Sequence, residues 1–195
     1  MVEEIKKAFE HLTGIAIPKA GEIKLKHSAP LVISFEDDGR TPNNVFPVII
    51  YRQVMEFDNR FNPAAQFEVI FSCNGWKQSW RNGMYSFIHF HTQAHEVLGV
   101  ARGRLLAQFG GSKGDEFELA PGDVVIIPAG VGHKRLNASR DILIVGAYAH
   151  GGHYDERRPG EISNRKTRDR IARVPLPEYD PLFGKDGQLL ELWRT

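Results

Sequence analysis

The sequence predicts a mainly β fold, a β-sandwich or closed barrel with short flanking helices. From Gly83 onward, short β-rich segments follow one another between glycine and proline turns. We place them near residues 84–91, 96–102, 104–109, 116–120, 123–127 and 142–149. Two further β-rich segments, 31–35 and 48–54, precede them and are joined by a polar loop. Many short strands without alternating helices favour a sandwich or barrel over βαβ units.

Two helices are expected beside the strands. Apolar residues recur at helical spacing between residues 2 and 12, which predicts a short amphipathic helix that packs as an arm. Asn62 and Pro63 resemble a helix cap and first helical position. Apolar residues then share one face as far as Asn74 and Gly75, where a helix would end. The second helix is therefore placed near residues 63–73.

The composition changes along the chain and suggests three parts. Residues 155–173 are rich in charge and arginine, residues 174–187 are rich in proline and glycine, and residues 189–193 are mostly apolar. A mobile tail would not need this apolar ending. We expect an N-terminal helix and arm at 1–45 and a barrel at 46–150. A C-terminal arm at 151–195 would then dock on the barrel or on a second subunit.

Composition excludes several functional classes. The 195 residues suit one domain, and 25 Lys+Arg against 24 Asp+Glu leave a net charge of +1, which does not favour nucleic acid or an anionic membrane as a partner. The single cysteine, Cys73, excludes an internal disulfide and is expected to be a small buried apolar residue. The longest apolar run, 142–149, is far below the ~20 residues that span a bilayer. Residues 1–7 lack an apolar signal core, so a cytoplasmic location is expected.

Four of the eight histidines fall between positions 89 and 133. His89 and His91 lie two apart in an apolar segment, and residues i and i+2 of a strand point to the same face. Such a strand would hold two imidazoles side by side, as a metal chelate requires. Tyr85 and Phe87 would share this face and line the same cavity.

Two further residues extend this pair to a metal site. Glu96 opens the next strand, and His133 follows the rigid turn 128–130. Neutral imidazoles and a carboxylate suit a divalent transition metal such as Fe, Mn, Ni, Zn or Cu. Taken singly, each histidine fits a hydrogen-bonded core residue and Glu96 fits a surface carboxylate. The hypothesis therefore depends on their combination.

The spacing of these residues resembles the two motifs of the cupin superfamily. The first motif matches Gly83, His89, His91, Glu96 and Gly103, and the second matches Gly122, Pro128, Gly130, His133 and Asn137. The resemblance implies a double-stranded β-helix, the RmlC-like jelly-roll barrel, with one divalent metal per chain. By position, the implied ligands are His89, His91, Glu96 and His133.

Longer segments resemble one subgroup, the YjlB-like bacterial cupins, whose function is not established. These segments are 35–39, 74–76, 79–83, 95–103 and 180–187. This resemblance extends from about residue 30 to the end of the chain, whereas the two motifs cover only residues 83–137.

Other histidines and aromatic residues have more than one interpretation. His95 and Glu96 are adjacent, so on a strand they point to opposite faces. Motif spacing favours Glu96 as the ligand and leaves His95 as an alternative ligand, a supporting group or a pocket residue. Trp80 could line a pocket, pack in the core or form an interface. The candidate pocket residues are therefore Tyr85, Phe87, Trp80 and His95. His150 and His153 are loop histidines or, with Tyr154, lie near the barrel mouth, while His11 and His27 are taken as unrelated to the site.

A metal site of this kind predicts an enzyme acting on a small organic molecule, of oxygenase or isomerase/lyase type. Its catalytic candidates are Glu96 and a metal-bound water. The alternative is a non-catalytic small-ligand binding or sensor protein with a structural metal, and a third interpretation is a structural dimer whose histidines have lost their role. Outward apolar residues such as Ile88 and Phe90, together with the two arms, predict a homodimer.

Overall fold

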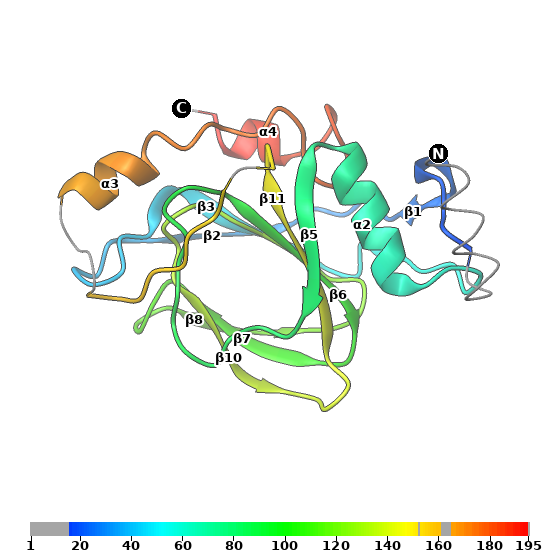
Figure 1. Ribbon diagram of the computed structural model, residues 1–195, viewed down its shortest axis with the longest axis horizontal. Helices are drawn as coiled ribbons and strands as arrows, with labels where there is room; N and C mark the ends of the chain where they lie inside the picture. The colour runs from blue at the N-terminus through cyan, green and yellow to red at the C-terminus, as the bar shows by residue number, and fades with distance from the viewer. Residues whose placement is uncertain (1–15, 152, 161–164, 195) are drawn as a thin grey trace.

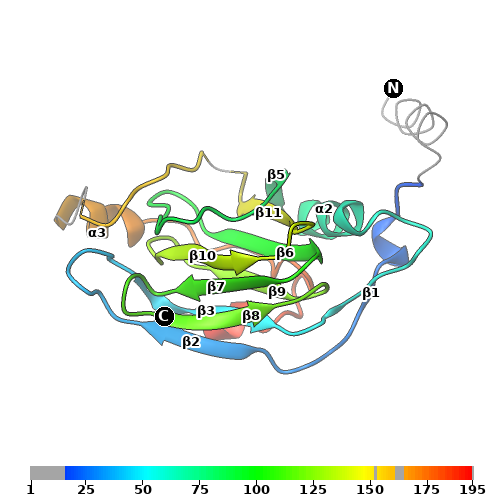
Figure 2. The ribbon, with the colours of Figure 1, turned by 90° about the horizontal axis from the view of Figure 1, so that it is seen from below.

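Two antiparallel sheets form a jelly-roll barrel in the computed structural model, which describes residues 16–151, 153–160 and 165–194 (Figure 1). The larger sheet has the order β2 (Leu31–Phe35), β3 (Asn44–Tyr51), β9 (Val124–Ile127), β6 (Glu96–Arg102), β11 (Leu143–Ala149) and β5 (Trp76–Asn82). The smaller has the order β10 (His133–Ala138), β7 (Leu105–Phe109) and β8 (Asp115–Leu119), which Figure 2 shows side by side. A two-residue pair, β1 (Lys24–Leu25) with β4 (Met55–Glu56), lies apart from them. The mainly β, jelly-roll prediction is confirmed.

Alternation along the strands creates an inner and an outer apolar core. On β6, Leu98 and Val100 pack inward between the two sheets, whereas Val97 faces the outer layer. The outer layer consists of helix α2 (Pro63–Cys73) and the C-terminal segment, which cover the outside of the six-stranded sheet (Figure 1). Gly99 permits close packing of α2, because a Cβ there would lie 2.7 Å from the ring of Phe67. Both faces of the central strands are therefore buried.

The predicted helix near 63–73 is confirmed, and its boundaries follow from its capping residues. The Asn62 side chain accepts a hydrogen bond from the backbone N–H of Ala64 (2.9 Å), and Pro63 occupies the first turn. After Asn74, Gly75 has φ of 81°, a conformation that glycine adopts readily. The expectation for Cys73 is wrong, because this residue ends the helix and is exposed.

The strand predicted at 84–91 is also wrong. Within this segment only isolated bridges occur, between His89 and His133 and between Phe90 and Arg157. Phe90 is fully buried rather than directed outward, so it cannot serve as an interface residue. The strand pattern also missed β5 and β10, since most of their side chains are polar. Polar strands of this kind give no apolar alternation for sequence inspection to detect.

The C-terminal segment packs on the barrel of its own chain. Trp193, one residue after helix α4 (Leu189–Leu192), is 2% exposed and donates from Nε1 to the carbonyl of Pro47 (3.0 Å). Asp180 is fully buried and accepts hydrogen bonds from the hydroxyl of Tyr51 (3.0 Å) and the backbone N–H of Leu182 (2.9 Å). Two short helices, η1 (Ala20–Glu22) and α3 (Arg165–Ile171), complete the described elements.

The division into arms and barrel stays a prediction, although β2, which precedes residue 46, forms the edge of the larger sheet. The helix expected between residues 2 and 12, together with His11, lies outside the described residues. In the part of the chain that the structure describes, no helix has the length and apolar character needed to cross a membrane.

Candidate metal centre

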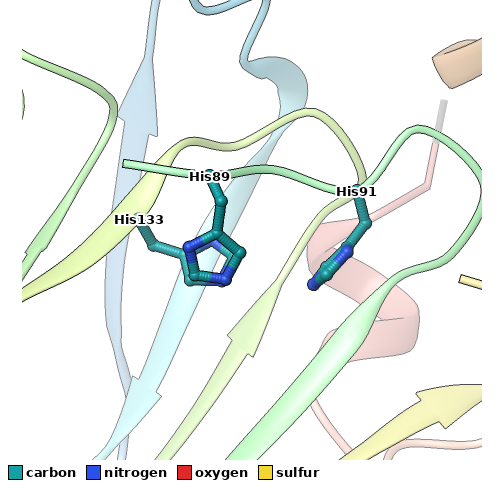
Figure 3. A group of neighbouring side chains, drawn as sticks. All are labelled: His89, His91 and His133. Carbon is teal, nitrogen blue, oxygen red and sulfur yellow. The ribbon is translucent and has the colours of Figure 1, made fainter. Parts of the chain in front are cut away.

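Three histidines from two chain segments meet inside the barrel (Figure 3). His89 and His91 lie on the connection between β5 and β6, and His133 begins β10. Two backbone hydrogen bonds join His89 to His133, from N–H to C=O in each direction (3.1 and 2.9 Å), and place their rings 4.1 Å apart. One ring nitrogen from each histidine lies within 4.8 Å of the other two. The isolated bridge between His89 and His133 therefore brings imidazole rings together without the regular strand predicted at 84–91.

Backbone carbonyls set the orientation of each ring. Nδ1 of His133 faces the carbonyl of Val131 (3.0 Å), and Nδ1 of His89 faces that of Phe87 (3.4 Å). Nδ1 of His91 faces the carbonyl of Asp155. A carbonyl only accepts, so in the neutral ring the proton belongs on Nδ1 and the lone pair on Nε2. Such partners are typical of histidines that bind a metal through the other nitrogen.

Glu96 brings a carboxylate to the same point. It begins β6 and shares the inward face of Leu98, and its Oε2 lies 3.3 Å from Nε2 of both His91 and His133. Glu96 is only 2% exposed. Nε2 of His91 is buried and makes no hydrogen bond with good geometry among the described residues. Lone pairs and an anion that face one another out of water require a cation between them.

The electrostatics of the site agree with this requirement. Burial, then the neighbouring histidines, lower the pKa of His89 to about 3, so its ring is neutral. Burial alone would raise the pKa of Glu96, but His91 and His133 hold it well below its usual value, so the carboxylate is ionised. Burial lowers the pKa of His91, yet Glu96 outweighs it and the net direction is upward. Glu96 therefore needs a positive partner, either a proton on His91 or a metal ion. Neutral imidazoles and one carboxylate fit a divalent transition metal.

The cluster lies at a cavity of about 180 Å³. Trp80 and Tyr85, two of the four candidate pocket residues, line this cavity. Nε1 of Trp80 donates to the hydroxyl of Tyr148 (3.2 Å), and its ring lies against Gly146, where a Cβ would be 2.2 Å from the ring. The absence of a side chain at Gly146 on β11 therefore leaves room for the Trp80 ring.

The other two candidate pocket residues do not line the cavity. The ring of Phe87 lies 3.9 Å from the guanidinium carbon of Arg158. His95 faces the outer core, where its Nδ1 accepts from the backbone N–H of Ala129 (3.0 Å) and its ring lies 4.8 Å from that of Trp193. Burial lowers the pKa of His95 to about 4. His95 and Glu96 do point to opposite faces, and Glu96 is the one inside the barrel.

The three other histidines that the structure describes lie outside the cavity. His150 is exposed, with φ of 59° and Nε2 2.9 Å from the carbonyl of Leu176. His153 is exposed as well, and His27 is an exposed residue whose ring lies 4.9 Å from that of Phe183. Tyr154, by contrast, does line the cavity.

Sequence inspection missed several residues that belong to the site, among them Tyr148 and Asp155. Tyr148 lines the cavity, and its inward direction on β11 could have been read from the two-residue period that it shares with Ile144. Asp155 holds His91 through its backbone carbonyl. A carbonyl carries no side-chain signal, so no sequence pattern would have identified Asp155.

Comparisons with known proteins place the chain in a family. The cupin domain family matches residues 81–145. The uncharacterized protein YjlB of Bacillus subtilis (strain 168) is 38% identical over 160 residues, which cover 82% of this chain and 93% of YjlB.

Two solved structures resemble parts of the fold. The QdtA 3,4-ketoisomerase of Thermoanaerobacterium thermosaccharolyticum has a TM-score of 0.40 and 14% identity, covering 74% of this chain and 98% of that one. The acireductone dioxygenase of Bacillus anthracis has a TM-score of 0.33 and 18% identity, covering 43% of this chain and 57% of that one. The motif match at the histidine cluster and the similarity to YjlB over most of both chains together show that this chain belongs to the cupin family, as a YjlB-like member.

Proposed function

We propose that this cupin is a metal-dependent enzyme that acts on a small organic molecule. Its ligands are His89, His91, Glu96 and His133, which hold one divalent transition metal per chain. The observation that carries the proposal is the convergence of three imidazole nitrogens and one ionised carboxylate at a buried point that borders a cavity. Structural metal sites are closed by protein ligands, whereas catalytic sites keep a position open to substrate. The cavity beside the four donors supports the catalytic alternative.

The chain's own residues supply binding and proton control around this point. Burial, followed by the charge of Glu96, raises the pKa of Tyr148 above its usual value, so its hydroxyl remains protonated. Trp80 holds that hydroxyl by donating to its oxygen. The charge of Glu96 acts on this hydroxyl, and a substrate oxygen in the cavity would compete with that carboxylate for the hydrogen bond of Tyr148. A divalent ion, when bound, would polarise a substrate oxygen or lower the pKa of water.

This arrangement supports an oxygenase or an isomerase/lyase, two classes in which a polarised oxygen and a fixed hydroxyl donor are useful. A binding or sensor protein would use the same cavity without turnover. Identification of the metal in protein purified from its own host separates these classes, because iron favours dioxygen chemistry whereas zinc favours Lewis-acid chemistry.

Elemental analysis, combined with a matched pair of variants, tests the proposal. We expect about one divalent ion per chain in the wild type and in His153→Ala, whose histidine is exposed outside the cavity. We expect His133→Ala to lose most of the metal and to show no rise in Tm when metal is added. Absence of metal after both aerobic and anaerobic purification, with no response of Tm to any of the five metals, would overturn the proposal.

A further inference from the structure

Charged residues are distributed unevenly along the cavity. Three lining residues carry charge at neutral pH: Glu96 at the metal end, Glu156 and Arg81. The guanidinium of Arg81 is already paired in a fork with Glu68, through Nε to Oε1 (2.7 Å) and Nη2 to Oε2 (2.6 Å). Glu156 is exposed at the rim, and its charge raises the pKa of the Tyr85 hydroxyl. The rim therefore presents the carboxylate of Glu156, while the guanidinium of Arg81 is already paired with Glu68.

Aromatic rings line the same cavity as this carboxylate. Tyr148 and Tyr154 stack with centroids 4.4 Å apart and an interplanar angle of 11°, and both line the cavity. Tyr85 lies on the lining as well, with its ring 5.0 Å from that of His89, and Trp80 completes the set. The faces of tyrosine and tryptophan rings attract cations. Rings and carboxylate together form a site suited to a positively charged group.

The metal cluster has the reverse preference. Three neutral imidazoles and one carboxylate leave a divalent ion with a net charge of +1, which attracts an oxygen donor. The cavity of about 180 Å³ is smaller than the roughly 300–1,000 Å³ of pockets that bind drug-sized ligands. Resting on the function proposed above, we infer that the ligand is a small molecule with an oxygen donor at one end and a protonated amine at the other.

The inference predicts an order of affinities for probes that differ only at the far end. We choose 4-aminobutanoate, pentanoate and glutarate, with the longer 6-aminohexanoate, heptanoate and pimelate as a second series. Each series keeps one carboxylate for the metal and carries a positive, neutral or negative group at the other end. Calorimetry on metal-loaded protein should show the ω-amino acid of at least one series binding about fivefold to tenfold more tightly than its neutral isostere. The dicarboxylate should be the weakest of that series.

Variants of Glu156 and Tyr154 test whether these rim residues cause the preference for the amine. Glu156→Gln should reduce the preference for the amine to about twofold or less, while Glu116→Gln, which changes an exposed carboxylate on β8 away from the cavity, should retain it. Tyr154→Phe keeps the ring and should retain the preference, whereas Tyr154→Leu should weaken it. Metal content is measured on every variant, so that loss of the ion is not mistaken for loss of selectivity.

The outcomes separate this inference from the proposed function. If the protein loads metal but binds the dicarboxylate as tightly as the amine in both series, or if Glu156→Gln leaves the preference intact, the inference is wrong and the metal site stands. A protein that takes up no metal contradicts the proposed function instead.

Discussion

Nδ1 of His91 is held by the backbone carbonyl of Asp155, a residue 64 positions further along the chain. The Asp155 side chain fixes that carbonyl, since its Oδ1 accepts from the backbone N–H of Thr92 (2.7 Å) and its Oδ2 from the Thr92 hydroxyl (2.8 Å). Two backbone hydrogen bonds between Phe90 and Arg157 (2.9 and 3.0 Å) complete the attachment. The segment that follows β11 is thereby tied to the histidine pair.

This attachment predicts that Asp155→Ala weakens metal binding, because the carbonyl that orients the His91 ring is no longer anchored by the side-chain hydrogen bonds to Thr92. We expect affinity to fall by about 10- to 100-fold, as is typical when the partner of a ligating histidine is disturbed. Titration against a chromogenic chelator measures the change. Asp155→Asn keeps an oxygen for the Thr92 N–H and should lose less. Asp169→Ala, a control on α3, should bind metal like the wild type, and equal affinity in all three variants would refute the role of Asp155.

The buried pair of Tyr51 and Asp180 predicts a loss of stability in Tyr51→Phe. At pH 7 the variant should unfold with a free energy about 1–3 kcal/mol lower, because a hydrogen bond to a carboxylate is removed. Chemical denaturation measures this value. An unchanged midpoint and slope would show that the pair does not stabilise the C-terminal segment.

The same pair has a pH dependence. Burial, then the charge of Asp180, raises the pKa of Tyr51 above its usual 10.0. Above pH 10 the unfolded chain therefore releases the tyrosine proton while the folded chain keeps it, so the stability contributed by Tyr51 is complete below pH 10 and declines as the pH rises. The difference in unfolding free energy between wild type and Tyr51→Phe should shrink by up to about 1.4 kcal/mol per pH unit above that point. A difference that stays constant from pH 8 to pH 11 would contradict the shift.

The contact between Gly99 and Phe67 predicts that Gly99→Ala destabilises the protein. The new Cβ would lie 2.7 Å from the Phe67 ring, so α2 must move away from the sheet. Overpacking of this kind costs about 1–3 kcal/mol in the free energy of unfolding. Gly21→Ala is the control, since nothing lies within 4 Å of its Cβ position. Thermal denaturation of both variants should show a lower Tm for Gly99→Ala alone.

Edge strand β2 is where we expect a homodimer to form. Among the described residues its outer edge pairs with no strand, and Leu31 and Val32 are 46% and 45% exposed. Antiparallel pairing with the same strand of a second copy satisfies two-fold symmetry. Light scattering should give twice the chain mass of 22.0 kDa, and Val32→Lys should reduce it to one chain. A wild-type protein of 22.0 kDa would exclude this dimer.

The strands that could be predicted from the sequence are those with apolar residues at regular spacing. β6, β7, β8, β9 and β11 lie within one residue of their expected bounds, as does α2 with its Asn62 cap. β5 and β10 could not be predicted because most of their side chains are polar and show no regular apolar spacing. The alternation of side chains in segment 84–91 predicts a strand. In the structure this segment forms only isolated bridges, one of them between Phe90 and Arg157, and Phe90 is fully buried.

The sequence alone determined the donor types, because imidazoles two residues apart and a carboxylate at a strand start are local features. It also determined that His95 and Glu96 point to opposite faces, which follows from the two-residue period of a strand. Only the tertiary structure decided that Glu96 is the inward residue, that carbonyls orient the three rings, and that Tyr148, Tyr154 and Glu156 border the cavity. These relationships join segments far apart in the chain, and their register is set by packing between sheets, which no local pattern records.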